Sequence, residues 1–142
     1  MNSPAPQASL DETAQALRAT GARVTGARIA ILQLLRDVGR ALSHREVEEA
    51  LAGAQIDRVT VYRVLDWLTA EGLAHKIADA ERVFRFSAVG GRDHAHGHFT
   101  CRHCHNVFCL PAAAPVQVTL PNGFRADDVE LSVTGLCADC AA

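Results

Sequence analysis

The sequence predicts an α+β fold with a helical first half and a cysteine-rich second half that contains short strands. Helix-capping signals and apolar residues at helical spacing recur from Ser9 to Gly72. Two β-type runs follow, at 74–77 and 83–86, separated by A-D-A-E-R. Beyond them the chain carries two C-x-x-C pairs and the run H-A-H-G-H. These observations predict a winged helix-turn-helix followed by a small metal-binding α/β domain.

Capping residues define the first two predicted helices. Ser9 with Glu12 forms a capping box, and Gly21 is a plausible end for the helix that follows. The second helix begins near Thr25, runs to about residue 38 and ends at Gly39. We expect one of its faces to be buried, with Ile29, Leu32 and Leu35.

The third and fourth helices carry the same signals. Ser43 with Glu46 forms a second capping box, and the predicted buried stripe consists of Val47, Ala50 and Leu51. Asp57 caps the fourth helix, which runs to about Glu71 and stops at Gly72. The β-type runs then form a hairpin, the wing. Paired glycines in 88–92 indicate a hinge, so the predicted domains are 1–87 and 93–142.

Composition limits the classes of function. The 142 residues suit one domain or two very small ones, and 49% hydrophobic residues allow a core made mostly of Leu, Val and Ala. There is neither a signal-peptide pattern at the start nor a membrane-length apolar run, which predicts a cytoplasmic protein that does not contact membranes. A net charge of −2 provides no overall basic footprint for nucleic acid, although several arginines of the first half can cluster locally.

The fourth helix has one face suited to DNA. On a helical wheel the core side holds Val61, Val64, Leu65 and Leu68, and the opposite side holds Val59, Tyr62, Arg63 and Asp66. A Tyr ring packs well on a thymine methyl, and Arg forks onto guanine or phosphate. A merely solvated amphipathic helix is the alternative. The candidate DNA-contacting residues are Arg58, Thr60, Tyr62 and Arg63.

The two C-x-x-C pairs predict a closed metal site. Cys101 and Cys104 form one pair, and Cys137 and Cys140 form the other. Each pair presents two thiolates from a tight turn, and four thiolates complete the tetrahedral site that structural zinc favours. In a reducing compartment such pairs indicate metal or redox sites rather than disulfides. A redox pair would not require the matched second pair, so we expect one structural zinc.

Three stretches resemble the ferric-uptake-regulator family, in the order in which that family carries them. They are R-V-T-V-Y-R-V-L-D-W-L-T-A-E-G-L-A-H-K, H-A-H-G-H-F-T-C-R-H-C and G-F-R-A-D-D-V-E-L-S-V-T-G-L-C-A-D-C. The resemblance extends from about Gly21 to Cys140. It implies a homodimeric, metal-activated repressor that binds palindromic double-stranded DNA operators, with 93–142 as the metal-binding, dimerising domain.

A second, regulatory zinc is expected at His75, His96, His98 and Cys109. His96 and His98 share a strand face, and Cys109 lies on the partner strand. His75 begins the wing, so the metal would join the two domains and control DNA binding. His94 and Glu81 are alternatives for one ligand position, whereas His44, His103 and His105 receive no ligand role.

The family resemblance also bears on the metal. It implies zinc, because iron sensors of the family usually carry a His where Ala41 stands and an acidic ligand where Cys109 stands. A thiolate with imidazoles suits zinc better than ferrous iron. The expected function is repression of zinc-uptake genes, as in the zinc-uptake-regulator branch; a regulator of the same architecture that responds to iron, manganese or peroxide is the alternative. We do not expect an enzyme, since the H-x-E…P-C-x-x-C pattern of zinc deaminases is absent.

Overall fold

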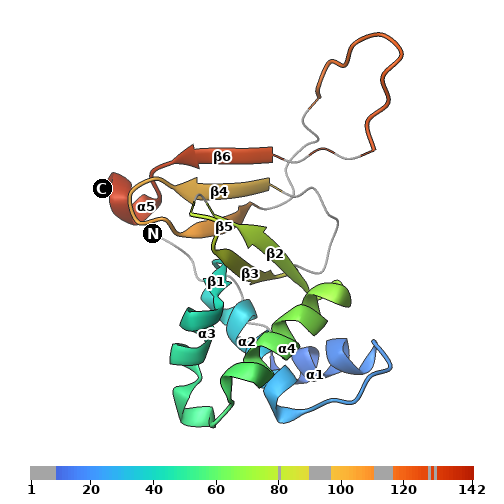
Figure 1. Cartoon of the computed structure of the whole chain (residues 1–142), viewed down its shortest axis with the longest axis vertical. Helices are drawn as coiled ribbons and strands as arrows, with labels where there is room; N and C mark the ends of the chain where they lie inside the picture. Colours follow the sequence, from blue (N-terminus) through green and yellow to red (C-terminus); the bar gives the residue numbers. More distant parts are fainter. Residues whose placement is uncertain (1–8, 80, 90–96, 111–116, 128, 130) are drawn as a thin grey trace. The chain divides into compact units, whose positions relative to one another are not determined.

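The computed structural model describes residues 9–79, 81–89, 97–110, 117–127, 129 and 131–142. The chain divides into two compact units, Met1–Val89 and Gly90–Ala142, called here the N-terminal and C-terminal units. Each unit contains helix and a three-stranded sheet (Figure 1). The predicted α+β class is therefore confirmed.

The N-terminal unit is a winged helix-turn-helix. Its elements are α1 (Leu10–Arg18), α2 (Gly26–Val38), β1 (Leu42–Ser43), α3 (His44–Ala50), the 3-10 turn η1 (Ala52–Ala54), α4 (Arg58–Ala70), β2 (Ala74–Ala78) and β3 (Phe84–Ala88). The antiparallel strands follow the order β1-β3-β2, and β2 with β3 forms the wing. Neither β1 nor η1 is expected from the sequence, because segments this short carry no periodic pattern.

The capping residues account for where the helices begin. The side chains of four N-cap residues accept hydrogen bonds from backbone N–H groups three positions on; these residues are Ser9, Thr25, Ser43 and Asp57. Gly39 ends α2 and Gly72 follows α4, with φ of 71° and 74°. A side chain at either position would be strained, because this left-handed conformation favours glycine.

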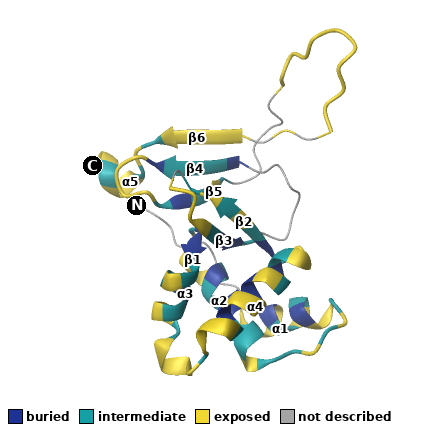
Figure 2. Cartoon of the chain, viewed as in Figure 1, coloured by how far each residue is buried: buried dark blue, intermediate teal, exposed yellow. Residues whose placement is uncertain are grey.

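The core of the N-terminal unit lies between the helices and the sheet. Its fully buried members include Phe86 from β3 and apolar residues of α2 and α4. The buried parts of these elements are dark blue in Figure 2. The expected face of α2 is confirmed, because Leu32 and Leu35 are buried and the half-buried Ile29 packs against the same core. Ile31 is buried as well. One expectation is wrong. Ala50 is exposed, because α3 ends there and the chain leaves the core.

An ionic network ties the wing to the start of α3. Glu46 accepts from Nη1 of Arg40 at 2.7 Å and from Nη1 of Arg85 at 2.6 Å. Nε of Arg85 donates to Asp79 at 3.0 Å, and Asp79 also accepts from two N–H groups in the wing turn. The side chains of Arg85 and Asp79 are only 14% and 5% exposed. Burial opposes ionisation, but these hydrogen bonds hold the pKa values of Glu46 and Asp79 below their usual range.

We expect Arg85→Met to lower the free energy of unfolding by about 2–4 kcal/mol, because it leaves two partly buried carboxylates without a main partner. Both carboxylates have lowered pKa values, so this stabilisation is present above their unfolded-state pKa values. It is lost as the pH falls through the folded-state values. Denaturant unfolding at neutral and acidic pH measures the difference. Arg45→Met is the control, since it removes only an exposed pair with Glu49; equal effects of the two variants would contradict the expectation.

The C-terminal unit is a small sheet with a terminal helix. Its elements are β4 (Gly97–Cys101), β5 (Val107–Leu110), β6 (Leu131–Gly135) and α5 (Ala138–Ala141). The strand order is β5-β4-β6, with β4 antiparallel to β5 and parallel to β6. Within the described parts of the whole chain, no helix has the length and apolar character needed to span a membrane.

Candidate metal centre and candidate DNA interface

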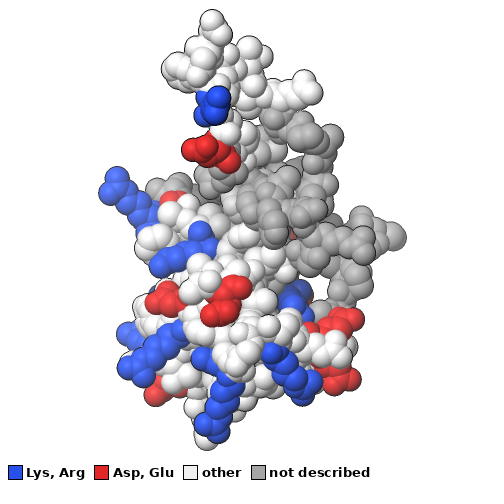
Figure 3. All heavy atoms as spheres, turned by 90° about the vertical axis from the view of Figure 1, so that its right-hand side faces the viewer, with Lys and Arg blue, Asp and Glu red and all other residues white. Residues whose placement is uncertain are grey.

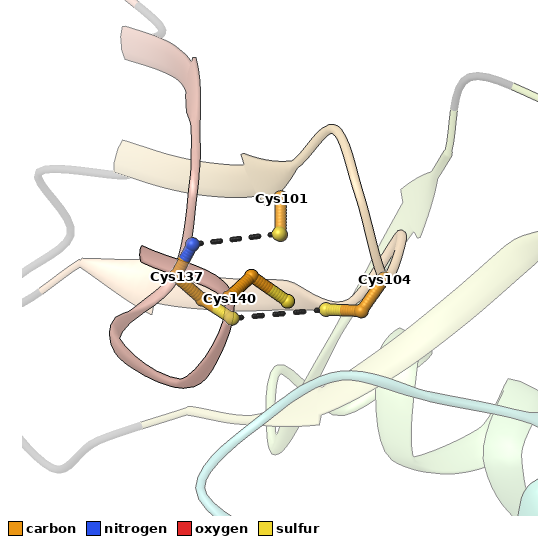
Figure 4. Close-up of side chains that lie close together, drawn as sticks. All are labelled: Cys101, Cys104, Cys137 and Cys140. Atoms are coloured by element: carbon orange, nitrogen blue, oxygen red, sulfur yellow. Dashed lines mark hydrogen bonds between the residues drawn. The ribbon is translucent and has the colours of Figure 1, made fainter. Parts of the chain in front are cut away.

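Four cysteines converge at one end of the C-terminal sheet. Cys101 ends β4 and Cys104 lies in the turn after it, while Cys137 is the N-cap of α5 and Cys140 lies within that helix. All four Sγ atoms lie within 4.8 Å of one another (Figure 4). The structure therefore brings both C-x-x-C pairs into a single cluster.

Each pair is shaped by a local turn. In the first pair, the N–H of His105 donates to the carbonyl of Cys101 at 2.9 Å, and His105 adopts a left-handed φ of 62° that turns the chain back toward β5. In the second pair, the N–H groups of Cys140 and Ala141 donate to the carbonyl of Cys137. Each turn directs its two thiols toward the same point, where the four Sγ atoms meet.

Parallel pairing of β4 with β6 joins the two turns. Cys101 is opposite Gly135, and the N–H of Arg102 donates to the carbonyl of Gly135 at 2.8 Å. The chain then continues from Gly135 directly to the second pair. The N–H of Cys137 consequently reaches Sγ of Cys101 at 3.4 Å.

The cluster fits a tetrahedral zinc ion. With Zn–S bonds of about 2.3 Å, neighbouring sulfurs of a tetrahedron lie roughly 3.8 Å apart. The Sγ atoms of Cys104 and Cys137 are 3.7 Å apart, and the other separations need to shrink by less than about 1 Å. Hydrogen bonds from the N–H groups of Cys104 and Cys137 lower the pKa of the Cys101 thiol to about 5, so one ligand is already ionised at neutral pH.

The other thiols must lose protons when a metal binds. A hydrogen bond with Cys137, burial and the neighbouring sulfurs raise the pKa of Cys140 to about 12. A divalent cation in the cluster reverses this, because it stabilises thiolates directly. Metal binding at the cluster is therefore coupled to proton release.

The residues expected for the second metal site are only partly described. His98 on β4 is directly opposite Cys109 on β5, and Nδ1 of His98 lies 3.9 Å from Sγ of Cys109. His75 lies on β2 in the N-terminal unit. His96 and the alternative ligand His94 lie outside the described residues. Glu81, the other alternative, is exposed in the wing turn, where its N–H donates to Asp79 at 2.8 Å.

The face of α4 predicted to contact DNA is exposed. The four expected core residues of this helix are buried, whereas Tyr62 is 43% exposed and Arg63 is exposed. Arg58 pairs with Glu48 at 3.1 Å, and the N–H of Thr60 donates to the cap residue Asp57 at 2.7 Å. Hydrogen bonding by Thr60 lowers the pKa of Asp57. Of the four residues predicted to contact DNA, Tyr62 and Arg63 are therefore exposed to a DNA duplex, whereas the other two have polar partners within the protein.

Charges of both signs lie on one face of the N-terminal unit. Figure 3 shows Lys and Arg side chains projecting from it, interspersed with Asp and Glu. Among the arginines of the first half, Arg28 lies over the Trp67 ring at 3.8 Å from its centroid and donates to the carbonyl of Arg23. The described surface therefore combines basic groups with acidic neighbours, in agreement with the net charge of −2.

One contact at this face is not expected from the sequence. The imidazole of His44 stacks on the ring of Tyr62, with centroids 3.8 Å apart. Sequence patterns do not predict it, because it joins the start of α3 to the exposed face of α4. The sequence shows only that His44 is the first residue of α3. That position does not distinguish a histidine on the surface from one packed against an aromatic ring.

Comparison with known proteins places this fold among metal-responsive regulators. The sequence pattern described as "Ferric uptake regulator family" matches residues 19–133. The chain is 33% identical to "Transcriptional regulator FurA" of Mycobacterium tuberculosis, an alignment that covers 94% of this chain and 92% of FurA.

Two solved structures of zinc-related regulators are also similar. "Crystal structure of holo XcZur" has a TM-score of 0.62 and 26% identity, covering 93% of this chain and 96% of that one. "Zinc Uptake Regulator Complexed With Zinc AND DNA" has a TM-score of 0.65 and 24% identity, covering 93% and 92%.

Proposed function

The chain belongs to the ferric uptake regulator family, and we propose that it is a zinc-responsive repressor of zinc-uptake genes. Members of this family are metal-dependent transcriptional regulators rather than enzymes. The finer assignment has three parts: a structural zinc at the four cysteines, a regulatory zinc at a second site, and operator binding by a homodimer through α4.

The structural zinc is supported by the geometry of the cysteine cluster. Four sulfur ligands leave no open coordination position, so this site stabilises the fold and performs no catalysis. It links the end of β4 to α5 and thereby holds β6 in place. We assign one such zinc to each chain.

The regulatory zinc is supported by the facing pair of His98 and Cys109, and this is the observation that carries the choice of metal. For a zinc ion with one Zn–N and one Zn–S bond, the two ligand atoms lie roughly 3.6 Å apart; the observed distance is 3.9 Å. A thiolate beside an imidazole favours zinc over the harder iron and manganese ions. We propose His75 and His96 as the remaining ligands, with His94 or Glu81 as alternatives for one of them.

A regulator of the same family that responds to iron, manganese or peroxide is the competing assignment. Titration of metal-depleted protein with zinc, ferrous iron and manganese separates the two. DNA binding is followed by anisotropy on a duplex that the zinc-loaded protein selects from a random-sequence pool. Zinc should restore binding, whereas ferrous iron and manganese should not do so at the same free concentration; restoration by either of them at that concentration, or loss on peroxide treatment alone, would contradict the zinc assignment.

Dimerisation is supported by the outer strand of the C-terminal sheet. In the described strand order, β6 lies at the edge, and its apolar residues Leu131 and Val133 are 36% and 37% exposed. An edge strand with exposed apolar side chains favours pairing with a second chain. A symmetric dimer would present two α4 helices to a palindromic operator.

The domain roles follow from these sites. We propose that 1–87 binds DNA, 88–92 acts as the hinge and 93–142 binds metal and dimerises. We place the protein in the cytoplasm, where the chromosomal DNA of bacteria such as the organism of the FurA relative lies.

We expect Tyr62→Ala and Arg63→Ala each to weaken binding to the selected duplex by about 1–3 kcal/mol if the lost contact is to a base. Fold and zinc content should not change, because both side chains are exposed on α4. Binding should also weaken steeply as salt rises, since phosphate contacts release counterions. Glu71→Ala, an exposed residue at the far end of α4, is the control; isotherms identical to the parent for both test variants would show that this face is only solvated.

A further inference from the structure

The side chain of His44 packs between a core residue, Phe86, and Tyr62 on the exposed face of α4. Its ring lies against Tyr62 with the two planes inclined by only 24°. The His44 ring also makes an edge-to-face contact with Phe86, with ring centroids 4.8 Å apart and an angle of 71° between the two ring planes. Phe86 is fully buried, so the imidazole connects a fixed core residue to a residue of the proposed DNA interface.

The backbone that carries His44 is held from both directions. The preceding residue, Ser43, pairs with Arg85 across β1 and β3 and forms a capping box with Glu46. Glu46 is in turn held by Arg40 and Arg85. These contacts hold the backbone of His44 in place. The side chain of Tyr62, by contrast, is 43% exposed and is contacted by the His44 ring.

The imidazole acts here as a neutral aromatic ring. Within the described residues its Nε2 is buried and has no hydrogen-bond partner. Burial lowers the pKa of His44, with Lys76 of β2 acting in the same direction and Asp66 of α4 and Glu48 of α3 opposing it. Since Nε2 is inaccessible, this nitrogen does not hydrogen-bond to DNA, and the ring contacts Tyr62 through its stacking face.

We propose that His44 is a positioning residue that holds Tyr62 in one orientation for DNA binding. The inference rests on the proposed contact between Tyr62 and DNA. A long aromatic side chain on a helix surface has two favourable χ1 orientations. Restricting it to one on binding opposes affinity, and a stacked neighbour that restricts it beforehand removes that cost.

The test is a double-mutant cycle on the zinc-loaded, full-length protein. Its members are the parent, His44→Ala, Tyr62→Ala and the double variant, and the probe is the duplex selected by the parent. His44→Ala should weaken binding about two- to tenfold, the loss expected for one newly mobile side chain. In the Tyr62→Ala background it should have no further effect, because no tyrosine is left to position.

Two further variants test whether the aromatic face is what matters. His44→Phe should retain parental affinity because it keeps a ring against Tyr62, whereas His44→Gln, of similar size but without a ring, should behave like His44→Ala. Tyr62 is the only tyrosine in the chain, so the ring signals of ¹³C-tyrosine-labelled protein report on it alone. The upfield displacement caused by the stacked ring should persist in His44→Phe and disappear in His44→Gln.

Three outcomes would overturn the inference. Equal loss of affinity on His44→Ala in both backgrounds would mean that His44 acts through the fold or through its own contact. Parental affinity for His44→Gln would mean that the stack does not matter for binding. An unaffected Tyr62→Ala variant would overturn the Tyr62 contact and this inference together, whereas the first two outcomes leave the proposed function standing.

Discussion

Cys137→Ser is expected to remove about one zinc per chain and to leave the C-terminal unit unfolded or the protein monomeric. Structural zinc sites supply ~10 kcal/mol or more to folding at neutral pH, which exceeds the entire stability of many domains. The effect should be large here because the cluster joins Cys101 at the end of β4 to the helix after β6. Metal analysis, denaturant unfolding and sedimentation of the same preparation measure the three consequences.

Cys109→Ser is the matched control for this experiment. It also removes one thiol from the C-terminal unit, but Cys109 is exposed and lies outside the four-cysteine cluster. It should therefore keep the structural zinc and the folded state. Any zinc that it loses is the proposed regulatory ion, so denaturant unfolding and sedimentation are the readouts that separate the two variants. A Cys137→Ser protein that is stable, dimeric and fully loaded with zinc would overturn the assignment of the cluster.

Acid should weaken zinc binding by the cluster even in the parent protein. The high pKa of Cys140 means that zinc must displace a proton to bind there. A fall in the apparent zinc affinity with decreasing pH, measured by competition with a chelator of known proton dependence, is therefore expected. The Cys109→Ser protein is used for this measurement, because a site that contains Cys109 and histidines also exchanges protons for zinc.

Loss of the zinc response is the second large effect, expected for His96→Ala and Cys109→Ala. Zinc should raise the operator affinity of the parent by the ~5–150-fold that typical coupling free energies correspond to. A ligand shifts a conformational equilibrium only through its different affinities for the two states, so removing a metal-binding side chain removes that difference. Both variants should keep the structural zinc and dimerise, yet bind DNA nearly equally with and without added zinc.

His103→Ala is the control for the regulatory site. His103 is an exposed histidine of the C-terminal unit with no proposed ligand role, and its removal should leave the zinc response at the parental level. The measurement is operator binding against free zinc, with bound metal counted in parallel. A normal response of Cys109→Ala would mean that Cys109 is not a ligand, and His94 would become the candidate for that position.

Local signals in the sequence predict most of the N-terminal unit. Each helix start depends on a side chain and an N–H group three residues apart, and each recurring apolar stripe reflects the helical period. The buried face of α4 follows directly from that period. The error at Ala50 occurs at the end of a helix, where the neighbouring elements decide which side chains are covered.

The sequence by itself determined the helix boundaries, the wing and the pairing of cysteines within each C-x-x-C turn. Only the tertiary structure decided that β6 runs parallel to β4, which brings Cys137 to Cys101. It also decided that Arg85 joins Glu46 to Asp79 and that His44 stacks on Tyr62. The physical reason is distance along the chain: a turn or a cap forms between residues a few positions apart, whereas these contacts join residues brought together only when strands and helices pack around a common core.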